Sequence, residues 1–358
     1  MTTRPLPPAD LDHILLHTRH IFPALAGARL FITGGTGFFG HWLLESLLHA
    51  NRQLSLNAQA TVLTRDAGAF RTRSPHITDD PAITLLEGDI RTFPFPPEPH
   101  THILHAATDS GGQQARPPAY ALAESVLEGT RRTLQFALHA GATRLLYVST
   151  GAVYGRSSAI ETHIPETSTA APDQLLLQSS YDESKRMSEH LCVACSHNTQ
   201  LETVIARPFA FVGPHLPLYA HFAIGNFLGS AIAGTLIHIR GDGTPIRSWL
   251  YAADLAIWLW HLLLRGAPNR AYNVGSEAAH TIAEAAHITA RTLRPGPDGA
   301  ATIPIRIDGV PDPDAPMNSY VPSTARARAE LGLRETIALE DALRRTAAWH
   351  GYQPPPSP

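Results

Sequence analysis

The sequence predicts an α/β fold in which a doubly wound parallel sheet is joined to a smaller α+β lobe. Short apolar runs that suit buried strands alternate with helical segments from residue 28 to residue 206, which is the pattern of βα units in a parallel sheet. A glycine-rich segment joins the first of these strands to the helix that follows it. The 358 residues are enough for one large core and a second, smaller lobe.

The expected elements follow from the apolar patterns in chain order. Residues 9–26 should form an extra helix and a connector before the first strand. Strands are expected at 28–32, 60–64, 83–86, 101–105, 144–149 and 203–206, and helices at 38–50, 121–140 and 181–197. Two further segments, 109–118 and 156–180, should be mobile loops at the edge where such sheets bind ligands.

Composition excludes several classes of protein. The formal net charge of −3 implies no polyanionic partner. The sequence has no basic cluster interleaved with aromatic residues, so nucleic-acid binding is not expected. The sequence lacks an apolar run of about 18 residues, the length that a membrane span needs. Residues 1–12 lack the apolar core of a signal peptide. A soluble cytoplasmic protein is therefore expected.

Cys192 and Cys195 share one helical face and should be packing residues, so no metal site is predicted.

The glycine-rich segment, residues 33–40 (TGGTGFFG), predicts a dinucleotide site. Gly34 would permit a tight turn, Gly37 the close approach of a pyrophosphate, and Gly40 close packing of the helix on the strand. The diphosphate would lie at the helix N-terminus, where amide donors and the helix dipole favour anions. The other cofactor contacts predicted in this segment are Thr36, Phe38 and Phe39.

The end of the second strand bears on the choice between NAD and NADP. An acidic residue there would bind the ribose 2′-hydroxyl of NAD, whereas an arginine accommodates the 2′-phosphate of NADP. This strand ends in the neutral Thr64, followed by Arg65, which favours NADP. Two alternatives stay open, because Asp66 could reach a ribose and the Arg-Asp pair could be a solvated turn.

A phenol and an ammonium lie one helical turn apart at Tyr181 and Lys185. The pKa of a free tyrosine, about 10, is too high for an effective base at neutral pH, and a lysine at i+4 can stabilise the phenolate. Tyr181 could then exchange a proton with an alcohol while a cofactor exchanges hydride. A hydroxyl at a strand end should complete the set, with Thr150 the first choice and Ser149 the second.

With these residues in place, the chain resembles the extended short-chain dehydrogenase/reductases, the nucleotide-sugar epimerase/dehydratase family, over about residues 28–348. The motifs that carry the resemblance are TGGTGFFG, His105-Ala106-Ala107, STGAVYG at 149–155, the Tyr181/Lys185 pair, and Gly241-Asp242-Gly243 followed by Arg247. It implies cofactor contacts at Asp89, Ile90, Ala106, Ala107, Pro208, Tyr181 and Lys185. It also implies substrate contacts at Thr150, Asn226, Arg247 and Asn273, with Arg247 on the nucleotide diphosphate.

The resemblance divides the chain into four regions. Residues 1–27 are expected to be an N-terminal helical extension, and 28–207 a Rossmann-type dinucleotide-binding domain completed by parts of 249–275. Residues 208–248 and 276–350 should form the substrate-binding lobe, and 351–358 a disordered tail. The helices at 121–140 and 181–197 pair between subunits in the resembling family, which implies a homodimer.

One departure from the family shapes the functional prediction. The 4,6-dehydratases carry Thr-Asp-Glu where this chain has Thr150-Gly151-Ala152, and elimination of water needs that acid and base. The leading prediction is therefore an NAD(P)-dependent nucleotide-sugar epimerase or ketoreductase that acts through a 4-keto sugar. The alternatives are a nucleotide-sugar dehydratase that uses other groups of the 156–180 loop, an NADPH-dependent reductase of a non-sugar carbonyl, and a non-catalytic dinucleotide sensor.

Overall fold

A computed structural model describes residues 3–108, 118–155, 162–220, 222–297, 299–314 and 316–353 of the protein. Its centre is a parallel sheet of seven strands in the order β3-β2-β1-β4-β5-β6-β11, which confirms the predicted doubly wound α/β fold. The strands are β1 (Arg29–Thr33), β2 (Gln59–Thr64), β3 (Ile83–Glu87), β4 (His102–His105), β5 (Arg144–Val148), β6 (Glu202–Pro208) and β11 (Arg270–Val274). Parts of the predicted loops at 109–118 and 156–180 and of the predicted tail at 351–358, namely residues 109–117, 156–161 and 354–358, lie outside the described residues.

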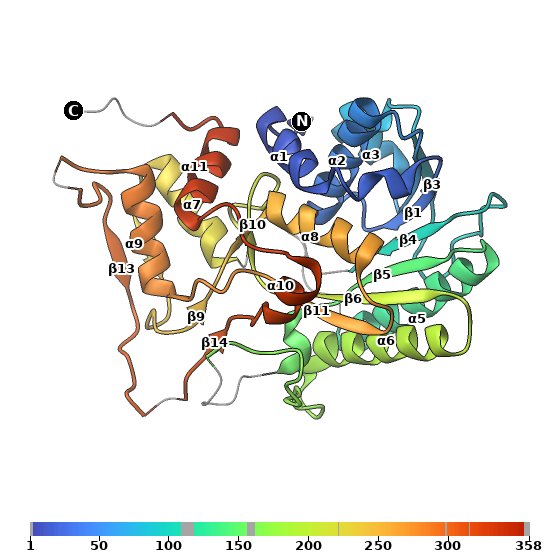
Figure 1. Ribbon diagram of the computed structural model, residues 1–358. Helices are drawn as coiled ribbons and strands as arrows, with labels where there is room; N and C mark the ends of the chain where they lie inside the picture. The colour runs from blue at the N-terminus through green and yellow to red at the C-terminus, as the bar shows by residue number, and fades with distance from the viewer. Residues whose placement is uncertain are drawn as a thin grey trace.

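Helices cover both faces of this sheet (Figure 1). One face carries α1 (Pro8–Thr18), α2 (Phe38–Leu54) and α8 (Ala252–Arg265), which pack against one another. The other carries α5 (Ala119–His139) and α6 (Ser180–His197), which lie side by side along their length. Two short helices, α3 (Ala67–Arg73) and α4 (Pro75–Thr78), connect β2 to β3.

The strand order reverses beside β1. The chain runs from β1 to β2 and β3 on one side, and then crosses back to place β4 on the other side of β1. Ligands of open α/β sheets bind in the crevice at the carboxyl ends of the strands where this reversal occurs. The topology therefore predicts a ligand site beyond the ends of β1 and β4.

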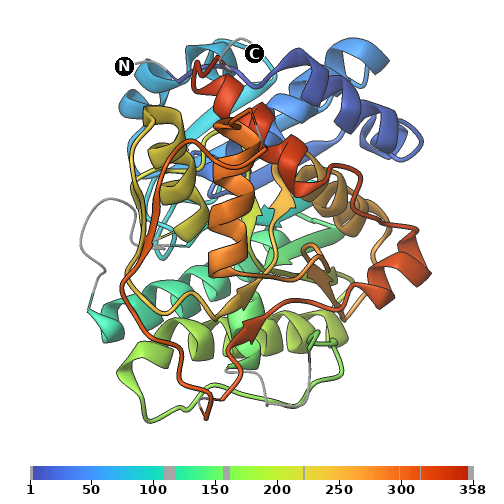
Figure 2. The ribbon, with the colours of Figure 1, turned by 90° about the vertical axis from the view of Figure 1, so that its left-hand side faces the viewer.

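The segments after β6 build a smaller lobe, which Figure 2 shows from its own side. Its main helices are α7 (Ala223–Ala233), α9 (Ile282–Leu293) and α11 (Leu339–Trp349), and α10 (Ala325–Leu331) lies against β11. Its strands are short: β7 (Phe211–Val212), β8 (Ile237–Ile239), β9 (Ile246–Arg247), β10 (Leu250–Tyr251), β12 (His280–Thr281), β13 (Ile305–Ile307) and β14 (Ser319–Tyr320). β9 pairs with both β12 and β14, which brings residue 320 beside residue 247.

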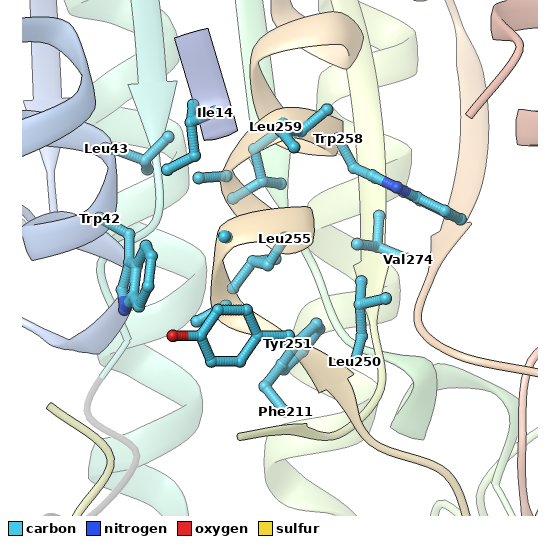
Figure 3. Packing of buried hydrophobic residues seen from close by; sticks show 14 of the residues in the cluster. Ile14, Trp42, Leu43, Phe211, Leu250, Tyr251, Leu255, Trp258, Leu259 and Val274 are labelled. Atoms are coloured by element: carbon cyan, nitrogen blue, oxygen red, sulfur yellow. The ribbon is translucent and has the colours of Figure 1, made fainter. Parts of the chain in front are cut away.

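Helix α8 lies in the centre of the molecule and joins the two parts. All its residues except Arg265 are buried, and Leu255, Trp258 and Leu259 pack against α1, α2 and the sheet (Figure 3). The buried Asp254 carboxylate accepts hydrogen bonds from the amides of Thr336 and Ile337, at 2.9 and 3.1 Å, which satisfies a charge that would otherwise be costly to bury. No helix in the described part of the chain is long and apolar enough to cross a membrane.

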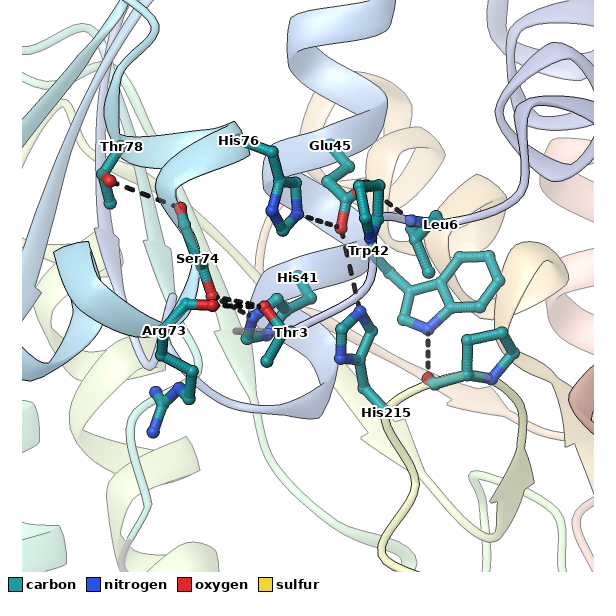
Figure 4. A network of polar contacts seen from close by, with 12 residues as sticks. Thr3, Leu6, His41, Trp42, Glu45, Arg73, Ser74, His76, Thr78 and His215 are labelled. Atoms are coloured by element: carbon teal, nitrogen blue, oxygen red, sulfur yellow. Dashed lines mark hydrogen bonds and ion pairs between the residues drawn. The ribbon is translucent and has the colours of Figure 1, made fainter. Parts of the chain in front are cut away.

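A buried polar network fastens the N-terminal residues and the smaller lobe to α2 (Figure 4). The Glu45 carboxylate accepts a hydrogen bond from the Leu6 amide at 2.8 Å and contacts the His76 ring at 3.2 Å. One turn earlier, the Trp42 indole donates to the carbonyl of Pro214 at 3.1 Å. Since α2 starts at the glycine-rich segment, these contacts hold that segment in a fixed position relative to both lobes.

Candidate active site

A cavity of about 1000 Å³ lies at the carboxyl ends of the central strands, between the sheet and the smaller lobe. Its wall contains most of the residues predicted to form a site: Gly34, Thr36, Gly37, Phe38, Phe39, Arg65, Asp89, Ile90, Ala106, Ala107, Thr150, Tyr181, Pro208 and Arg247. Four other predicted site residues are not part of this wall: Gly40, Lys185, Asn226 and Asn273. The structure thus brings together residues that are up to 213 positions apart in the sequence, from Gly34 to Arg247.

The glycine-rich segment forms a tight cradle at the cavity wall. Gly34 has φ +75°, and a Cβ there would lie 2.5 Å from the carbonyl oxygen of Ala106, so a larger residue would displace the neighbouring strand end. A Cβ on Gly40 would lie 2.1 Å from the Gly35 carbonyl oxygen, because α2 packs directly on the loop. Gly37 is the N-cap of α2 and provides no side-chain cap, so the first amides of α2 are left as donors. The cradle fits a dinucleotide diphosphate.

His105 holds the neighbouring strand end in place. Its Nδ1 shares a hydrogen bond of 2.7 Å with the Thr33 hydroxyl, which accepts the Ala107 amide at 3.0 Å. Its Nε2 contacts the Thr130 hydroxyl at 3.2 Å. Complete burial, aided by the nearby Lys185, lowers the pKa of His105 to about 3. His105 is therefore a neutral structural residue that fixes the backbone opposite Gly34.

Several arginines surround the part of the cavity at the end of β2. Arg65 follows β2 in the wall, and Arg91 lies there in an ion pair with Asp89 at 2.8 Å. Arg73 donates to the carbonyl of Thr36, within the cradle, at 3.3 Å. The Asp66 carboxylate instead caps α3 by accepting the Ala69 amide at 2.7 Å, so this potential ribose ligand is occupied by the helix terminus.

The three residues predicted to perform the chemistry lie at the ends of β5 and the start of α6. Thr150 caps the 3-10 turn at residues 151–154, where its hydroxyl accepts the Ala152 amide at 3.2 Å. Lys185 is only 2% exposed, and its Nζ donates to the Val148 carbonyl at 2.8 Å. The Nζ also lies 6.0 Å from the centre of the Tyr181 ring. The ammonium thus lies behind the tyrosine, while Tyr181 and Thr150 face the cavity.

The sequence did not point to Tyr320, which belongs to the same site. Its phenol lines the cavity together with Thr150. Burial raises the pKa of this phenol above the ordinary range, so it stays neutral. The centre of the Tyr320 ring lies 4.6 Å from the centre of the Phe209 ring. The Arg247 guanidinium lies 5.9 Å from the centre of the Tyr320 ring. Tyr320 reaches this position only because β14 pairs with β9, and no local sequence motif reports that pairing.

The four residues predicted to contact substrate divide into two groups. Thr150 and Arg247 line the cavity, and the Arg247 guanidinium is oriented by the carbonyls of Ile246 and Asn318, at 2.8 and 3.0 Å. The two asparagines lie elsewhere. The Asn226 amide donates to the Ala220 carbonyl at 3.0 Å. Asn273 is fully buried, and its side chain is engaged by Tyr154, by the Ile164 carbonyl and by the Ser323 carbonyl.

Comparisons with known proteins agree with this architecture. A model of the NAD dependent epimerase/dehydratase family matches residues 30–275. The dTDP-glucose 4,6-dehydratase of Streptomyces antibioticus is 24% identical over 324 residues, which cover 90% of this chain and 92% of that protein. UDP-glucuronic acid decarboxylase 1 of Arabidopsis thaliana is 26% identical over 317 residues, or 88% of this chain and 68% of that protein.

A solved structure shows the same fold. DesIV, a dTDP-glucose 4,6-dehydratase from Streptomyces venezuelae crystallised with NAD and TYD bound, superposes with a TM-score of 0.72. The two chains are 24% identical, and the superposition covers 90% of this chain and 97% of DesIV. The shared fold therefore extends over the sheet and the smaller lobe alike.

Proposed function

Because this chain belongs to the NAD-dependent epimerase/dehydratase family, we propose that it converts a nucleotide-diphosphate sugar through a 4-keto sugar, by hydride transfer at C4. Membership confirms the resemblance predicted from the motifs, and the protein is an enzyme of this NAD-dependent, nucleotide-sugar type. The observation that carries the proposal is the placement of Tyr181 and Thr150 in the same cavity wall as the glycine cradle.

In this reaction Tyr181 acts as the acid/base. The substrate C4 hydroxyl would hydrogen-bond to Thr150 and transfer its proton to the Tyr181 phenolate. The glycine cradle would hold the diphosphate of a nicotinamide dinucleotide, which would supply the hydride acceptor when bound. The Lys185 ammonium behind the ring stabilises the phenolate, because a nearby opposite charge favours the ionised form. The Ala152 amide, which donates to the Thr150 hydroxyl at 3.2 Å, keeps this hydroxyl in place at the cavity wall.

For the fate of the 4-keto sugar, the relatives favour a dehydratase over the epimerase or ketoreductase that the sequence first suggested. The relatives include dTDP-glucose 4,6-dehydratases from several bacteria, among them Streptomyces niveus and Neisseria gonorrhoeae. Elimination of water requires an acid and a base beside C5 and C6, which Gly151 and Ala152 do not provide. Elimination in this site would therefore need another acid and another base at the cavity.

An epimerase is the second candidate, and one observation favours it. A Cβ on Gly151 would lie 2.7 Å from the Phe209 ring, so this position is filled by an aromatic side chain where dehydratases carry an acid. A C4 epimerase needs Tyr181 alone as acid/base, since it returns the hydride to the other face of the ketone. The missing acid therefore leaves epimerisation chemically complete.

Products formed from dTDP-glucose, UDP-glucose and UDP-glucuronate distinguish these outcomes. The purified enzyme is incubated in D₂O with each sugar nucleotide and either NAD or NADP, and the products are identified by NMR. A dehydratase gives a 4-keto-6-deoxy sugar that contains solvent deuterium, whereas an epimerase gives the C4 epimer without it. The Tyr181→Phe variant is the control. Failure of every sugar nucleotide to react, or equal conversion by Tyr181→Phe, would contradict the proposed function.

Arg247 is the proposed anchor of the substrate diphosphate. A guanidinium can bind two phosphate oxygens in a planar, bidentate geometry that lysine does not reproduce. Two carbonyls fix its Nη1, and the Tyr320 ring lies beside it. The guanidinium is therefore pre-oriented at the cavity wall, and this supports a diphosphate-linked substrate.

The cofactor is proposed to be NADP in preference to NAD. Arg65 lies at the end of β2, and Arg73 is tied to Thr36 of the cradle, so two guanidinium groups flank the predicted position of a ribose 2′-phosphate. The nearest carboxylate, Asp66, is occupied as the cap of α3. Both features favour an anionic 2′-substituent over a 2′-hydroxyl.

The enzyme is proposed to be a homodimer formed through α5 and α6. These helices pack together on one face of the sheet (Figure 1). Large apolar side chains remain exposed on them: Tyr120 and Leu138 on α5, and Met187 on α6. A second copy of this helix pair is the partner that would cover them.

A further inference from the structure

Lys185 is the only lysine in the sequence, and the other 27 residues of the Lys+Arg total of 28 are arginine. The chain therefore uses arginine for every other cationic position. An ammonium is compact and changes its pKa readily, whereas a guanidinium is planar, larger and always charged. The one lysine lies where these properties matter, fully buried behind Tyr181 with Nζ on the Val148 carbonyl at 2.8 Å.

The surroundings of Lys185 contain few charges. The ring of Tyr147 on β5 lies 4.8 Å from Nζ, and Cys192 lies two turns further along α6. Burial raises the pKa of the Tyr147 phenol and of the Cys192 thiol, so both are neutral. His105 on β4 is also neutral, because burial lowers its pKa to about 3.

Glu189 is the charged group that remains. It lies one turn after Lys185 on the same face of α6, at i+4. Burial lowers the pKa of Lys185 to about 7, and the Glu189 carboxylate is the largest effect in the opposite direction. Asp182, one turn before Lys185, contributes to the raised pKa of Tyr320.

Glu189 is itself held by a chain of buried polar groups. Its carboxylate accepts Nε and Nη2 of Arg207 on β6, at 3.0 and 2.6 Å. Arg207 Nη1 donates to the Tyr154 hydroxyl at 2.8 Å, and that hydroxyl donates to Oδ1 of Asn273 on β11 at 2.8 Å. Tyr154 ends the 3-10 turn that Thr150 caps. The network therefore connects the helix that carries Lys185 with the turn that carries Thr150.

We propose that Glu189, clamped by Arg207, Tyr154 and Asn273, is the positioning residue of the active-site lysine: it fixes the rotation of α6 and supplies the negative charge opposite the Lys185 ammonium. The inference rests on the proposed function for its catalytic meaning, because the lysine acts through Tyr181. It also assigns Asn273 to this network, in place of the substrate contact that the sequence suggested.

The single lysine allows a direct test that needs neither substrate nor cofactor. Protein grown with lysine labelled at ¹³Cε carries the label at one position only, so one NMR resonance reports the titration of Lys185. The midpoint for the native enzyme is expected near the pKa of about 7. In Glu189→Gln it should fall by at least about one pH unit, because loss of a nearby opposite charge disfavours the ammonium.

Glu189→Gln leaves Arg207 as an unpaired buried charge, which can destabilise the fold. The double variant Glu189→Gln/Arg207→Gln removes both charges, and a downward shift smaller than that of Glu189→Gln is expected, because the loss of the Arg207 charge opposes the loss of the carboxylate. Glu189→Asp retains the carboxylate and should recover most of the native midpoint. The matched control is Glu202→Gln, which removes the carboxylate of another arginine pair, with Arg144, at the outer end of β6. Its Lys185 midpoint should equal the native value.

A native Lys185 midpoint in a folded Glu189→Gln or double variant would overturn the inference and reduce the ion pair to a packing element. Folding is checked by circular dichroism and thermal unfolding. The titration is independent of turnover. If the Lys185 midpoint does not move in these variants, only the proposed role of Glu189 is contradicted. Failure of every sugar nucleotide to react would instead contradict the proposed function.

Discussion

Replacement of Lys185 by methionine should raise the pKa of the Tyr181 phenol strongly. Methionine has a similar length and no charge, so it preserves packing at this buried position. The Nζ lies 6.0 Å from the centre of the Tyr181 ring. With the phenolate charge placed at that ring centre and an effective dielectric constant of about 20, the two unit charges interact by about 3 kcal/mol, which corresponds to about two pKa units. The phenolate loses that stabilisation, so its pKa rises in Lys185→Met.

The difference in absorbance between an enzyme and its Tyr181→Phe counterpart isolates the titration of this one tyrosine. Tyrosinate absorption near 295 nm is followed against pH, first for the native enzyme minus Tyr181→Phe. The same difference is then measured for Lys185→Met minus Lys185→Met/Tyr181→Phe. Lys185 and Tyr181 titrate as a coupled pair, so apparent midpoints are compared. Equal midpoints for Tyr181 with and without Lys185 would refute the electrostatic argument, whatever the activity of the variants.

Four further results are expected. Tyr181→Phe should keep the fold and cofactor affinity but lose turnover by roughly 10²–10⁴-fold, the usual contribution of an acid/base group, and a loss below about tenfold would remove Tyr181 from that role. Arg65→Ala should weaken NADP more than NAD in fluorescence titrations, whereas equal losses would mark Arg65 as a solvated residue. Arg247→Lys should raise the Michaelis constant and weaken a nucleoside diphosphate, and unchanged affinity would place the diphosphate elsewhere. Light scattering should give twice the mass of the 38.7 kDa chain, and a monomer at micromolar concentration would contradict the proposed interface.

The sheet was predictable because its signals are local. Each strand is a short apolar run, and each βα connection fixes the direction of the next strand, so the alternation of patterns gives a parallel sheet. The glycine cradle was predictable for a similar reason. A side chain at Gly40 would collide with the backbone of Gly35, five residues earlier, and a side chain at Gly34 would collide with the backbone of Ala106, which follows the neighbouring strand. The short helices α3 and α4 were missed, because four to seven residues carry too little periodicity to be recognised.

The smaller lobe resists such prediction because its strands have only two or three residues. β9, β12 and β14 form one small sheet from segments spread over more than 70 residues of sequence, and nothing in a two-residue strand specifies its partner. Tyr320 was missed on this account, although it lines the cavity together with Thr150 and Arg247. Asn273 was predicted from the family resemblance to contact substrate, and only the structure shows that its side-chain amide is engaged by Tyr154.

The departure at Gly151 and the aromatic wall of the cavity are one structural feature. A side chain at Gly151 would collide with Phe209, Phe209 packs on Tyr320, and Tyr320 lines the cavity together with Thr150. An acid therefore cannot be added at position 151 without moving Phe209, and movement of Phe209 would remove the packing that holds Tyr320 in the cavity wall. The same contacts that exclude the usual acid thus hold a neutral phenol in the wall that contains Thr150. Any elimination catalysed by this enzyme must use that phenol or another group at the cavity. The groups that donate and accept protons in it should therefore differ from those of relatives with the Asp-Glu pair.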